Sequence, residues 1–468
     1  MQQVKTEETT TTLIGDSPPV QGPRLSLARK VGYGLGSSAS NFIWQMVSFY
    51  LVFFYTEVFG IPAAAVGTIL LASRIFDALN DPVMGHIADQ THTRWGRYRP
   101  YLLFNSVPIA VILVLTFSTP ELSANGKIAY AAVTYLLLGV AYTAMTVPHT
   151  ALMPSITQDT NERSSLASML TIAIFSTILV VAAVTMPLVN SFSSPQVGFT
   201  VTACIYGAVA IVLYLVCFAS TKELPSTQRS RHSLKEALQL VLANRPLLIL
   251  LVAVFFTQAA NDMRTTSALF FLKYNLGMES FYPVFMAIMI VSMIAGALLS
   301  PFLGRRLGSK RNLYVIGMLV VIATGTMVLF TPYEQVTAIV VLLAVSSLGV
   351  GITYVMTRSM LADMVEYGEW KTGVRGEGVT VSTYGVSNKL GYATGGSLAA
   401  FLLASAGYVP DVAQTPEALA MIRYMLVLFP VIAAATSIGI MLHYRVDARS
   451  FNHVLQQIQE RRAVSSQQ

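Results

Sequence analysis

Two carboxylates in an otherwise apolar stretch have the clearest capacity for chemistry. Residues 71–100 read LASRIFDALNDPVMGHIADQTHTRWGRYRP, with Asp77 and Asp81 four positions apart. A helix places both on one face, about one turn apart, and Asn80 adds a neutral carbonyl oxygen beside them. Because a carboxylate within a membrane segment is costly, it normally faces a cavity, a partner or an ion. The pattern predicts a site for a small hard cation or a proton. The alternative is a structural pair neutralised by Arg74, one turn earlier.

The composition of the chain indicates a membrane protein that crosses the bilayer many times. Of its 468 residues, 54% are hydrophobic and 11% are charged, whereas soluble domains carry about 25% charged residues. A membrane-spanning helix needs about 20 mainly apolar residues. We therefore predict an all-α membrane protein with twelve transmembrane helices, at 31–57, 62–88, 100–119, 128–157, 165–189, 197–219, 246–274, 281–303, 311–331, 335–365, 378–406 and 418–444.

A polar segment near the middle of the chain divides these spans into two six-helix halves. The halves are weakly alike, since FFYTEVFGI closes the first span and FFLKYNLGM closes the seventh. Internal repeats of this kind are typical of transporters, whose sites lie near the midplane between the repeats. We predict a disordered cytoplasmic tail at 1–25, an N-terminal bundle at 26–220, a cytoplasmic linker at 221–245, a C-terminal bundle at 246–445 and a cytoplasmic tail at 446–468.

Charge and cysteine usage exclude several other classes. Lysine and arginine gather in alternate loops, which places both termini in the cytoplasm. The net charge of +7 reflects this loop bias, and we expect no nucleic-acid partner. Cys204 and Cys217 share one apolar segment, so we expect neither a disulfide framework nor a metal site. The sequence contains no nucleotide-binding loop, metal-ligand spacing or nucleophile motif, and we therefore predict neither an enzyme nor a cofactor.

Two motifs resemble known transporter signatures. GHIADQTHTRWGRYRP is similar to the loop signature of the major facilitator superfamily, and the resemblance implies a cytoplasmic gate formed by Gly85, Asp89, Arg94 and Arg97. RIFDALNDP, together with DMVEYGEWKTGVRGEG at 363–378, resembles the glycoside-pentoside-hexuronide:cation symporters, the melibiose-permease-like family of that superfamily. The likeness covers the chain after its first tail, including GYGLG and SNKLGYATGG, and implies the major facilitator fold.

The same resemblance implies a set of ligands for the coupling cation. Asp77, Asn80 and Asp81 match the family's cation-binding acids and amide, and Thr143, in YTAMTVP, matches the threonine that completes the site. Lys389, in SNKLG, matches the family's functional lysine and is expected to serve coupling. Because an amide oxygen at position 80 can help to ligate sodium, we predict Na⁺ as the coupling ion, with H⁺ as the alternative.

The sugar-binding side departs from the family pattern. Asn41 and Thr146 stand where the melibiose-binding pattern has acids, so we do not expect a simple galactoside as substrate. Losing these anions removes a repulsion against an acidic sugar. Arg264 and Arg358 add positive charge at membrane depth, and arginine binds carboxylates through its planar fork. The alternative for each arginine is an internal pair with a neighbouring acid, Asp262 or Asp363.

Further polar residues extend the candidate substrate site. Trp44, with Gln45 beside it, would suit a sugar ring, although a tryptophan at that depth equally serves packing. Asn261 and Tyr354 are cavity candidates of the same kind. His149 completes the set, but a lone helical histidine is more often a hydrogen-bonded packing residue.

Together these features predict a secondary transporter that couples cation entry to uptake of a sugar derivative by alternating access. We expect an acidic glycoside, either a uronide or a short uronate oligosaccharide, carried by a monomer in the bacterial inner membrane. A neutral glycoside or pentoside is the alternative within the family. A sodium-coupled lipid carrier would need a wide apolar cavity open to the bilayer, and a non-transporting sugar sensor would need a long cytoplasmic extension.

Overall fold

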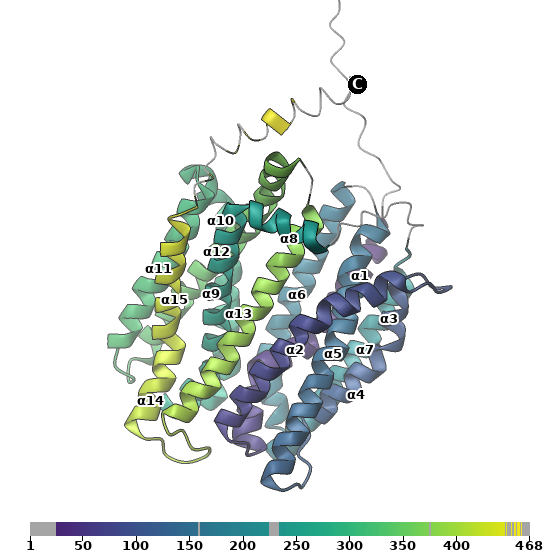
Figure 1. Ribbon diagram of the computed structural model, residues 1–468. Helices are drawn as coiled ribbons and strands as arrows, with labels where there is room; N and C mark the ends of the chain where they lie inside the picture. The colour runs from purple at the N-terminus through teal and green to yellow at the C-terminus, as the bar shows by residue number, and fades with distance from the viewer. Residues whose placement is uncertain are drawn as a thin grey trace, which may run out of the picture.

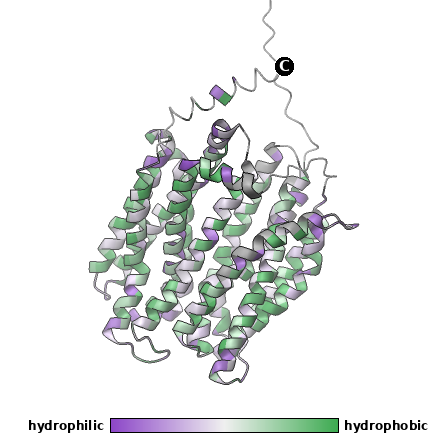
Figure 2. Ribbon diagram, in the orientation of Figure 1, coloured by the Kyte–Doolittle hydropathy of each residue, from purple (hydrophilic) through white to green (hydrophobic). Residues whose placement is uncertain are grey.

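The computed structural model describes residues 25–157, 160–223, 234–373, 376–444 and 446, with a few positions between 451 and 460. Within the helices, the side chains of Arg74, Asp81 and Asp89 are among those that lie outside the described residues. The described chain is helical apart from loops and one isolated bridge between Thr93 and Gly96. Its helices stand side by side (Figure 1), with hydrophobic residues along their lengths and hydrophilic residues gathered towards the ends (Figure 2).

The N-terminal half contains six of the predicted spans. Its third predicted span is broken at Asn105, whose side-chain amide donates to the Ala141 carbonyl at 2.7 Å. The elements are α1 (Leu27–Phe53) with its π-helical end η1 (Phe54–Val58), α2 (Ala63–Gln90), α3 (Arg99–Phe104), α4 (Ser106–Thr116), α5 (Ala124–Ile156), α6 (Thr160–Val189) and α7 (Pro195–Ser220).

The C-terminal half follows a short helix, α8 (Leu234–Ala243), which lies across one end of the bundle (Figure 1) within the predicted linker. Each of the twelve predicted spans coincides with one helix or a run of consecutive helices, so the predicted all-α architecture is confirmed. The remaining elements are α9 (Arg245–Phe270) with η2 (Phe271–Asn275), η3 (Glu279–Phe281), α10 (Tyr282–Leu307), α11 (Lys310–Phe330), α12 (Val336–Thr372), α13 (Glu377–Ser405), α14 (Pro416–Arg423), η4 (Tyr424–Leu428) and α15 (Phe429–Met441).

The described helices differ in how apolar they are. Eight of them are long and apolar enough to cross a membrane by length and composition alone. The other predicted spans are α1, α2, the broken pair α3–α4, and α13. Three of these pack against the opposite half, since α1 contacts α9 and α13, and α2 contacts α13. A helix that faces another half or a cavity, rather than lipid, tolerates polar residues.

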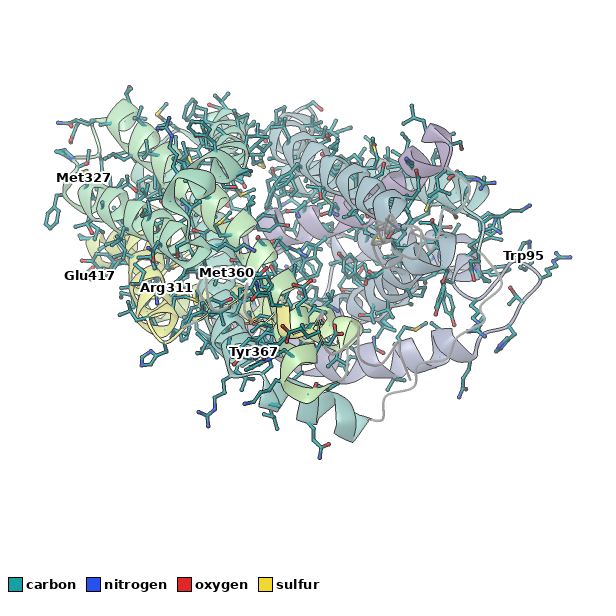
Figure 3. The ribbon with its side chains drawn as sticks, turned by 90° about the horizontal axis from the view of Figure 1, so that it is seen from above. Trp95, Arg311, Met327, Met360, Tyr367 and Glu417 are labelled. Carbon is teal, nitrogen blue, oxygen red and sulfur yellow. The ribbon has the colours of Figure 1, made fainter. Side chains whose placement is uncertain are left out.

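The two halves lie beside one another when the molecule is viewed from above (Figure 3). Trp95 lies at the outer edge of one half, and Met327 and Glu417 lie towards the opposite edge of the other. The halves meet through α1 with α9, α2 with α13, and α6 with α10. These six helices therefore carry the contacts between the halves, and most of the predicted site residues lie on them.

The internal repeat is visible in the backbone. FFYTEVFGI and FFLKYNLGM both end in a π-helical turn, at Phe54–Val58 and Phe271–Asn275. Each turn is followed by a glycine in the left-handed region, Gly60 with φ 75° and Gly277 with φ 65°. Only glycine adopts such a φ without strain. The similar sequences therefore produce the same helix ending in both halves.

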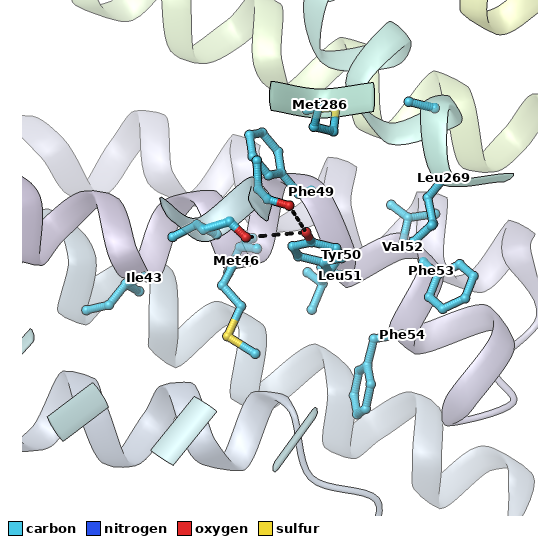
Figure 4. Packing of buried hydrophobic residues seen from close by; sticks show 14 of the residues in the cluster. Ile43, Met46, Phe49, Tyr50, Leu51, Val52, Phe53, Phe54, Leu269 and Met286 are labelled. Atoms are coloured by element: carbon cyan, nitrogen blue, oxygen red, sulfur yellow. Dashed lines mark hydrogen bonds between the residues drawn. The ribbon is translucent and has the colours of Figure 1, made fainter. Parts of the chain in front are cut away.

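Helix α1 is the most deeply packed element of the N-terminal half. Tyr50 is fully buried, and its hydroxyl donates to the carbonyls of Val181 and Ala182 on α6, both at 3.4 Å. Leu269 and Met286, from the other half, approach the same row of side chains (Figure 4). Burial of this row fixes α1 between its own bundle and the opposite one.

Candidate functional site

A cavity of about 350 Å³ lies between the halves, within the size range of small-molecule sites. Helices α1 and α6 line it from one side, and α9 to α13 with α15 from the other. The lining is mixed, with amides, hydroxyls, one guanidinium and the carboxylate of Asp262 set among aromatic rings and methionines. It brings together six of the predicted substrate residues, namely Asn41, Trp44, Gln45, Asn261, Arg264 and Tyr354.

The amides on α1 are ordered by their own helix. Asn41 Nδ2 donates to the Ser37 carbonyl at 2.9 Å, and Gln45 Nε2 donates to Asn41 Oδ1 at 3.3 Å. These contacts connect successive turns of one helix face. They fix the amide orientations at the cavity wall, which suits hydroxyl recognition because an amide both donates and accepts hydrogen bonds.

Arg264 is held in the cavity wall by neutral groups. Its guanidinium donates to Ser347 Oγ at 2.8 Å, to the Leu343 carbonyl at 2.9 Å and to Ser346 Oγ at 3.2 Å. These partners all lie on α12, and none is an anion. The neighbouring Asp262 instead accepts from Ser48 Oγ, across the two halves, at 3.0 Å. The described hydrogen bonds of Arg264 to oxygen therefore go to α12, whereas the alternative of an internal pair expected a bond to Asp262.

Arg358 lies next to the cavity rather than in its lining. Its guanidinium stacks over the rings of Tyr354 and Tyr384, at 5.5 and 4.8 Å from their centroids, and both tyrosines line the cavity. Asp363, its possible partner, accepts from Lys310 at 2.7 Å through both oxygens. The Arg358 contacts seen here are therefore to aromatic groups, which attract cations through their ring faces.

Two further predicted substrate residues, both on α5, lie outside the cavity lining. The ring of His149 stacks on Tyr33, with 4.6 Å between centroids, and its Nε2 lies 3.1 Å from the Tyr33 carbonyl. His149 is 4% exposed, which corresponds to the packing alternative for this residue. The Thr146 hydroxyl donates to the carbonyl of Tyr142, one turn earlier on α5, at 3.0 Å.

A second, much smaller cavity surrounds Asp77. Its volume is about 10 Å³, close to the space of a single water molecule. Asp77 packs against Gly139 on α5 so closely that a Cβ at that glycine would lie 2.6 Å from Oδ1. Thr143 follows one turn later and is buried. Three of the predicted cation ligands therefore lie on α2 and one on the facing helix α5, which contacts α2.

The remaining cation-site residues are placed as follows. Asn80 is half-buried, and its Nδ2 atom has no hydrogen-bond partner among the described residues. A buried N–H donor without a partner costs about 1–3 kcal/mol, but only the amide oxygen of Asn80, and not this nitrogen, could ligate a cation. Lys389 is half-buried on α13, the helix that packs against α2. The side chain of Asp81 lies outside the described residues.

The predicted gate loop is organised by a residue that sequence reasoning missed. The Glu223 carboxylate accepts from the backbone amides of Arg97, Tyr98 and Arg99, at 2.8, 2.9 and 2.9 Å. Gly96 has φ 110°, and a Cβ there would lie 2.5 Å from Glu223 Oε1. The signal was an acid placed just after the sixth apolar span.

Other parts of the gate prediction are only partly described. Gly85 is half-buried on α2, and the Asp89 side chain lies outside the described residues. Arg94 stacks over Trp95 at 4.1 Å, and the Arg97 guanidinium reaches His92 Nε2 at 3.5 Å. The cytoplasmic gate expected from these residues therefore stays a prediction.

A charged cluster that sequence reasoning also missed joins the halves at the opposite end. Lys273, at the end of α9, contacts Glu57, at the end of α1, at 2.6 Å and Asp411 at 2.7 Å. Tyr274 donates to Glu57 Oε1 at 2.5 Å. Hydrogen bonding to Lys273 lowers the pKa of the exposed Asp411 carboxyl. We call Glu57, Lys273, Tyr274 and Asp411 the end latch. Within the end latch, Glu57 comes from the repeated sequence FFYTEVFGI and Lys273 from FFLKYNLGM.

Two helical halves, a mixed cavity between them and a half-buried carboxylate beside that cavity define a secondary transporter of the major facilitator type. The sequence comparison identifies the family. The chain belongs to the MFS/sugar transport protein family, whose sequence model matches residues 32–448. The protein is therefore a membrane transporter of sugars rather than an enzyme, and symporters of this family move their substrate with a cation.

Curated relatives of similar length have related functions in their names. The isoprimeverose transporter of Lactiplantibacillus pentosus is 35% identical over 90% of this chain and 89% of its own. The glucuronide carrier protein homolog of Escherichia coli is 33% identical over 95% and 98%. A protein of Escherichia coli provisionally named a glycoside/cation symporter is 34% identical over 91% and 94%.

The fold is shared with solved transporters of low sequence identity. The crystal structure of the nucleoside transporter NupG covers 90% of this chain and 100% of its own, with a TM-score of 0.63 at 15% identity. This likeness concerns the fold alone and agrees with the predicted major facilitator architecture.

Proposed function

We propose that this protein imports an acidic glycoside, such as a uronide or a short uronate oligosaccharide, together with Na⁺. The observation that carries the substrate proposal is Arg264, a cavity guanidinium whose described partners are all neutral. A buried charge without a counter-charge is costly, and a substrate carboxylate would offset that cost. The relative named as a glucuronide carrier homolog supports this choice of substrate class.

The rest of the cavity suits the sugar ring. The Trp44 ring offers an apolar face, and Asn41 and Gln45 offer ordered amides on the next turns of α1. Asn261 and Tyr354 add polar groups from the opposite half. Arg358 contributes through Tyr354, since its guanidinium donates to that hydroxyl at 3.4 Å. The positive charge behind the tyrosines favours an anionic substrate in front of them.

Sodium is proposed as the coupling ion, with the proton as the alternative. Carboxylate, amide and hydroxyl oxygens from Asp77, Asp81, Asn80 and Thr143 form a donor set that suits a hard cation. Lys389, on the helix that packs against α2, would act in coupling because a cation near the site competes with the ion for the same carboxylates.

A neutral glycoside or pentoside is the second candidate substrate. The observation in its favour is that Arg264 already donates three hydrogen bonds to oxygen, so its guanidinium is satisfied without a substrate carboxylate. The relative named as an isoprimeverose transporter supports this alternative.

Uptake into proteoliposomes distinguishes the two candidates. Methyl β-D-glucuronide and methyl β-D-glucoside would be offered together under a sodium gradient, and the uptake of each would be measured. A parallel series would use a proton gradient. A charge-assisted contact is worth about 1.5–3 kcal/mol, so the glucuronide should compete about tenfold or more better. Arg264→Gln should reduce that preference towards unity.

The matched control is Arg423→Gln. Like Arg264, Arg423 donates to neutral groups, the carbonyls of Val328 and Thr331, but it lies outside the cavity lining. This variant should keep the parent's preference. Equal competition by the two sugars, unchanged in Arg264→Gln, would move the substrate to the neutral glycosides. Uptake that responds to the proton gradient alone would replace Na⁺ by H⁺.

A further inference from the structure

Trp44 forms a wall common to both cavities. It lines the central cavity with Asn41 and Gln45, and it lines the small cavity with Asp77 and Tyr142. Among the described lining residues, no other side chain belongs to both sets. Whatever occupies either cavity therefore meets the indole of Trp44 on one of its two sides.

An aromatic row passes through this wall from one half to the other. The rings of Trp44 and Tyr142 lie 4.9 Å apart at 31°, and Tyr142 borders the small cavity. On the other side, Tyr392 of α13 meets the indole edge at 6.4 Å and 77°, and Tyr392 lines the central cavity. Aromatic contacts of this kind resist independent movement of their members, because each ring packs against the next.

The small cavity has room for no more than one water-sized occupant. At about 10 Å³ it has the space of one water molecule. The opposite wall is fixed, since Gly139 approaches Asp77 at contact distance. A cation that keeps hydration water needs more room than this, and the indole of Trp44 is the wall that also borders the larger space of the central cavity.

We propose that Trp44 is the coupling partition of this transporter, a positioning residue through which the cation beside Asp77 and the sugar in the central cavity set each other's affinity. The inference rests on the proposed function for the location of the two ligands. Thermodynamic linkage requires the effect to be reciprocal, so the sugar must raise the affinity for the cation by the same factor. A tryptophan that only stacks on the sugar would change sugar affinity without changing that factor.

A single-tryptophan reporter tests the position of the indole without knowledge of the natural substrate. The chain has three tryptophans, so Trp95→Phe with Trp370→Phe leaves only Trp44. NaCl, titrated against choline chloride at constant ionic strength, should shift its emission in the absence of sugar, as should a change from pH 8 to pH 5 if H⁺ is the ion. Asp77→Asn in the same background should abolish the response. An emission unmoved by either cation, in a reporter protein that still performs coupled uptake, would overturn the proposal.

A binding measurement tests the coupling itself. Dissociation constants for methyl β-D-glucuronide and for isoprimeverose would be measured with and without the coupling cation. In the parent, the cation should tighten binding of the accepted sugar by about 5- to 150-fold, the usual range of coupling between sites. Trp44→Ala should bring that ratio close to one, and Trp44→Phe, which keeps a ring in place, should preserve much of it.

Phe175→Ala is the matched control, because Phe175 is an aromatic residue that lines the central cavity alone. It should weaken sugar binding and leave the cation ratio unchanged. A Trp44→Ala protein that binds sugar weakly but keeps the parent ratio would reduce Trp44 to a stacking residue and leave the proposed function intact. A parent whose binding of both sugars ignores both cations would overturn the partition and the proposed function together.

Discussion

At the scale of single residues, the membrane cost of charge made the main candidates visible in the sequence. Asp77 and Arg264 could be selected because a charged side chain within an apolar span needs a reason to be there. Their contacts could not be predicted, since they depend on which helix faces them. The serine pair that holds Arg264 lies about 80 residues away on α12. The position of Trp44 between the two cavities likewise depends on how the surrounding helices pack, which the sequence does not show.

Removing the charge at the proposed cation site should abolish coupled transport. Asp77→Asn should insert and fold but fail to accumulate sugar against a gradient, because the ion loses an anionic ligand. The measurement is cation-driven uptake by proteoliposomes. Asp363→Asn, which removes a carboxylate paired with Lys310 outside the cavity lining, serves as control. Normal accumulation by the Asp77 variant would remove this residue from the cation site.

The close approach of Gly139 to Asp77 gives a more delicate test of the same site. Gly139→Ala adds one methyl group where a Cβ would lie 2.6 Å from Oδ1, so the carboxylate must move. We expect the half-saturating cation concentration to rise several-fold with the protein still folded. In Gly439→Ala the new Cβ meets nothing within 4 Å, and that variant should behave like the parent. Indistinguishable cation curves for the two variants would contradict a role for this contact.

At the scale of elements, the apolar periodicity located the helices but not their interruptions. All twelve predicted spans coincide with helices, because the requirement of about 20 apolar residues is a strong constraint. The break at Asn105 and the helix α8 were not predicted. The first depends on a hydrogen bond to α5, and the second is a short amphipathic segment in a region whose polarity indicated only a linker.

Helices α9 and α13 should be sensitive to small changes where they touch. A Cβ at Gly395 would lie 2.3 Å from the Ala259 carbonyl and 2.9 Å from the Asp262 Cβ, so Gly395→Ala must push the helices apart. Overpacking of this kind costs about 1–3 kcal/mol. The thermal unfolding midpoint in detergent should fall, and sugar binding should weaken because Asp262 and Arg264 share α9.

Gly385→Ala, on the same helix, meets nothing within 4 Å and provides the control. Its unfolding midpoint should match that of the parent or exceed it, since alanine favours helix over glycine. Equal midpoints for the Gly385 and Gly395 variants would show that the α9–α13 contact relaxes without cost.

At the scale of the whole molecule, the end latch is the structural feature with the clearest mechanical consequence. Alternating access requires the two halves to separate at one end at a time. Lys273→Gln removes both ion pairs of the latch and should favour separation there. A cysteine introduced at Ser48, in the central cavity, should then react several-fold faster with a membrane-impermeant maleimide added from the side that we predict to be outside the cell.

Lys127→Gln is the matched control, since the hydrogen bond of Lys127 described here, to the Phe59 carbonyl, stays within the N-terminal half. It should leave the labelling rate of the introduced cysteine unchanged. A labelling rate in Lys273→Gln equal to that of this control would mean that aromatic packing, such as the contact of Phe53 with Phe270 at 5.7 Å, closes this end without the latch.

In the orientation that we predict, the latch also connects the rate of transport to the medium around the cell. The side chain of Asp411 is 67% exposed, whereas that of Glu57 is 2% exposed. At physiological salt, dissolved ions screen interactions between exposed charges over about 8–10 Å. They therefore weaken the contact of Lys273 with the exposed Asp411 more than its contact with the buried Glu57. A higher salt concentration outside the cell should therefore weaken the Asp411 contact of the end latch and leave the Glu57 contact largely unchanged. The rate of transport should therefore rise modestly with the external salt concentration, even when the protein transports none of the ions of that salt.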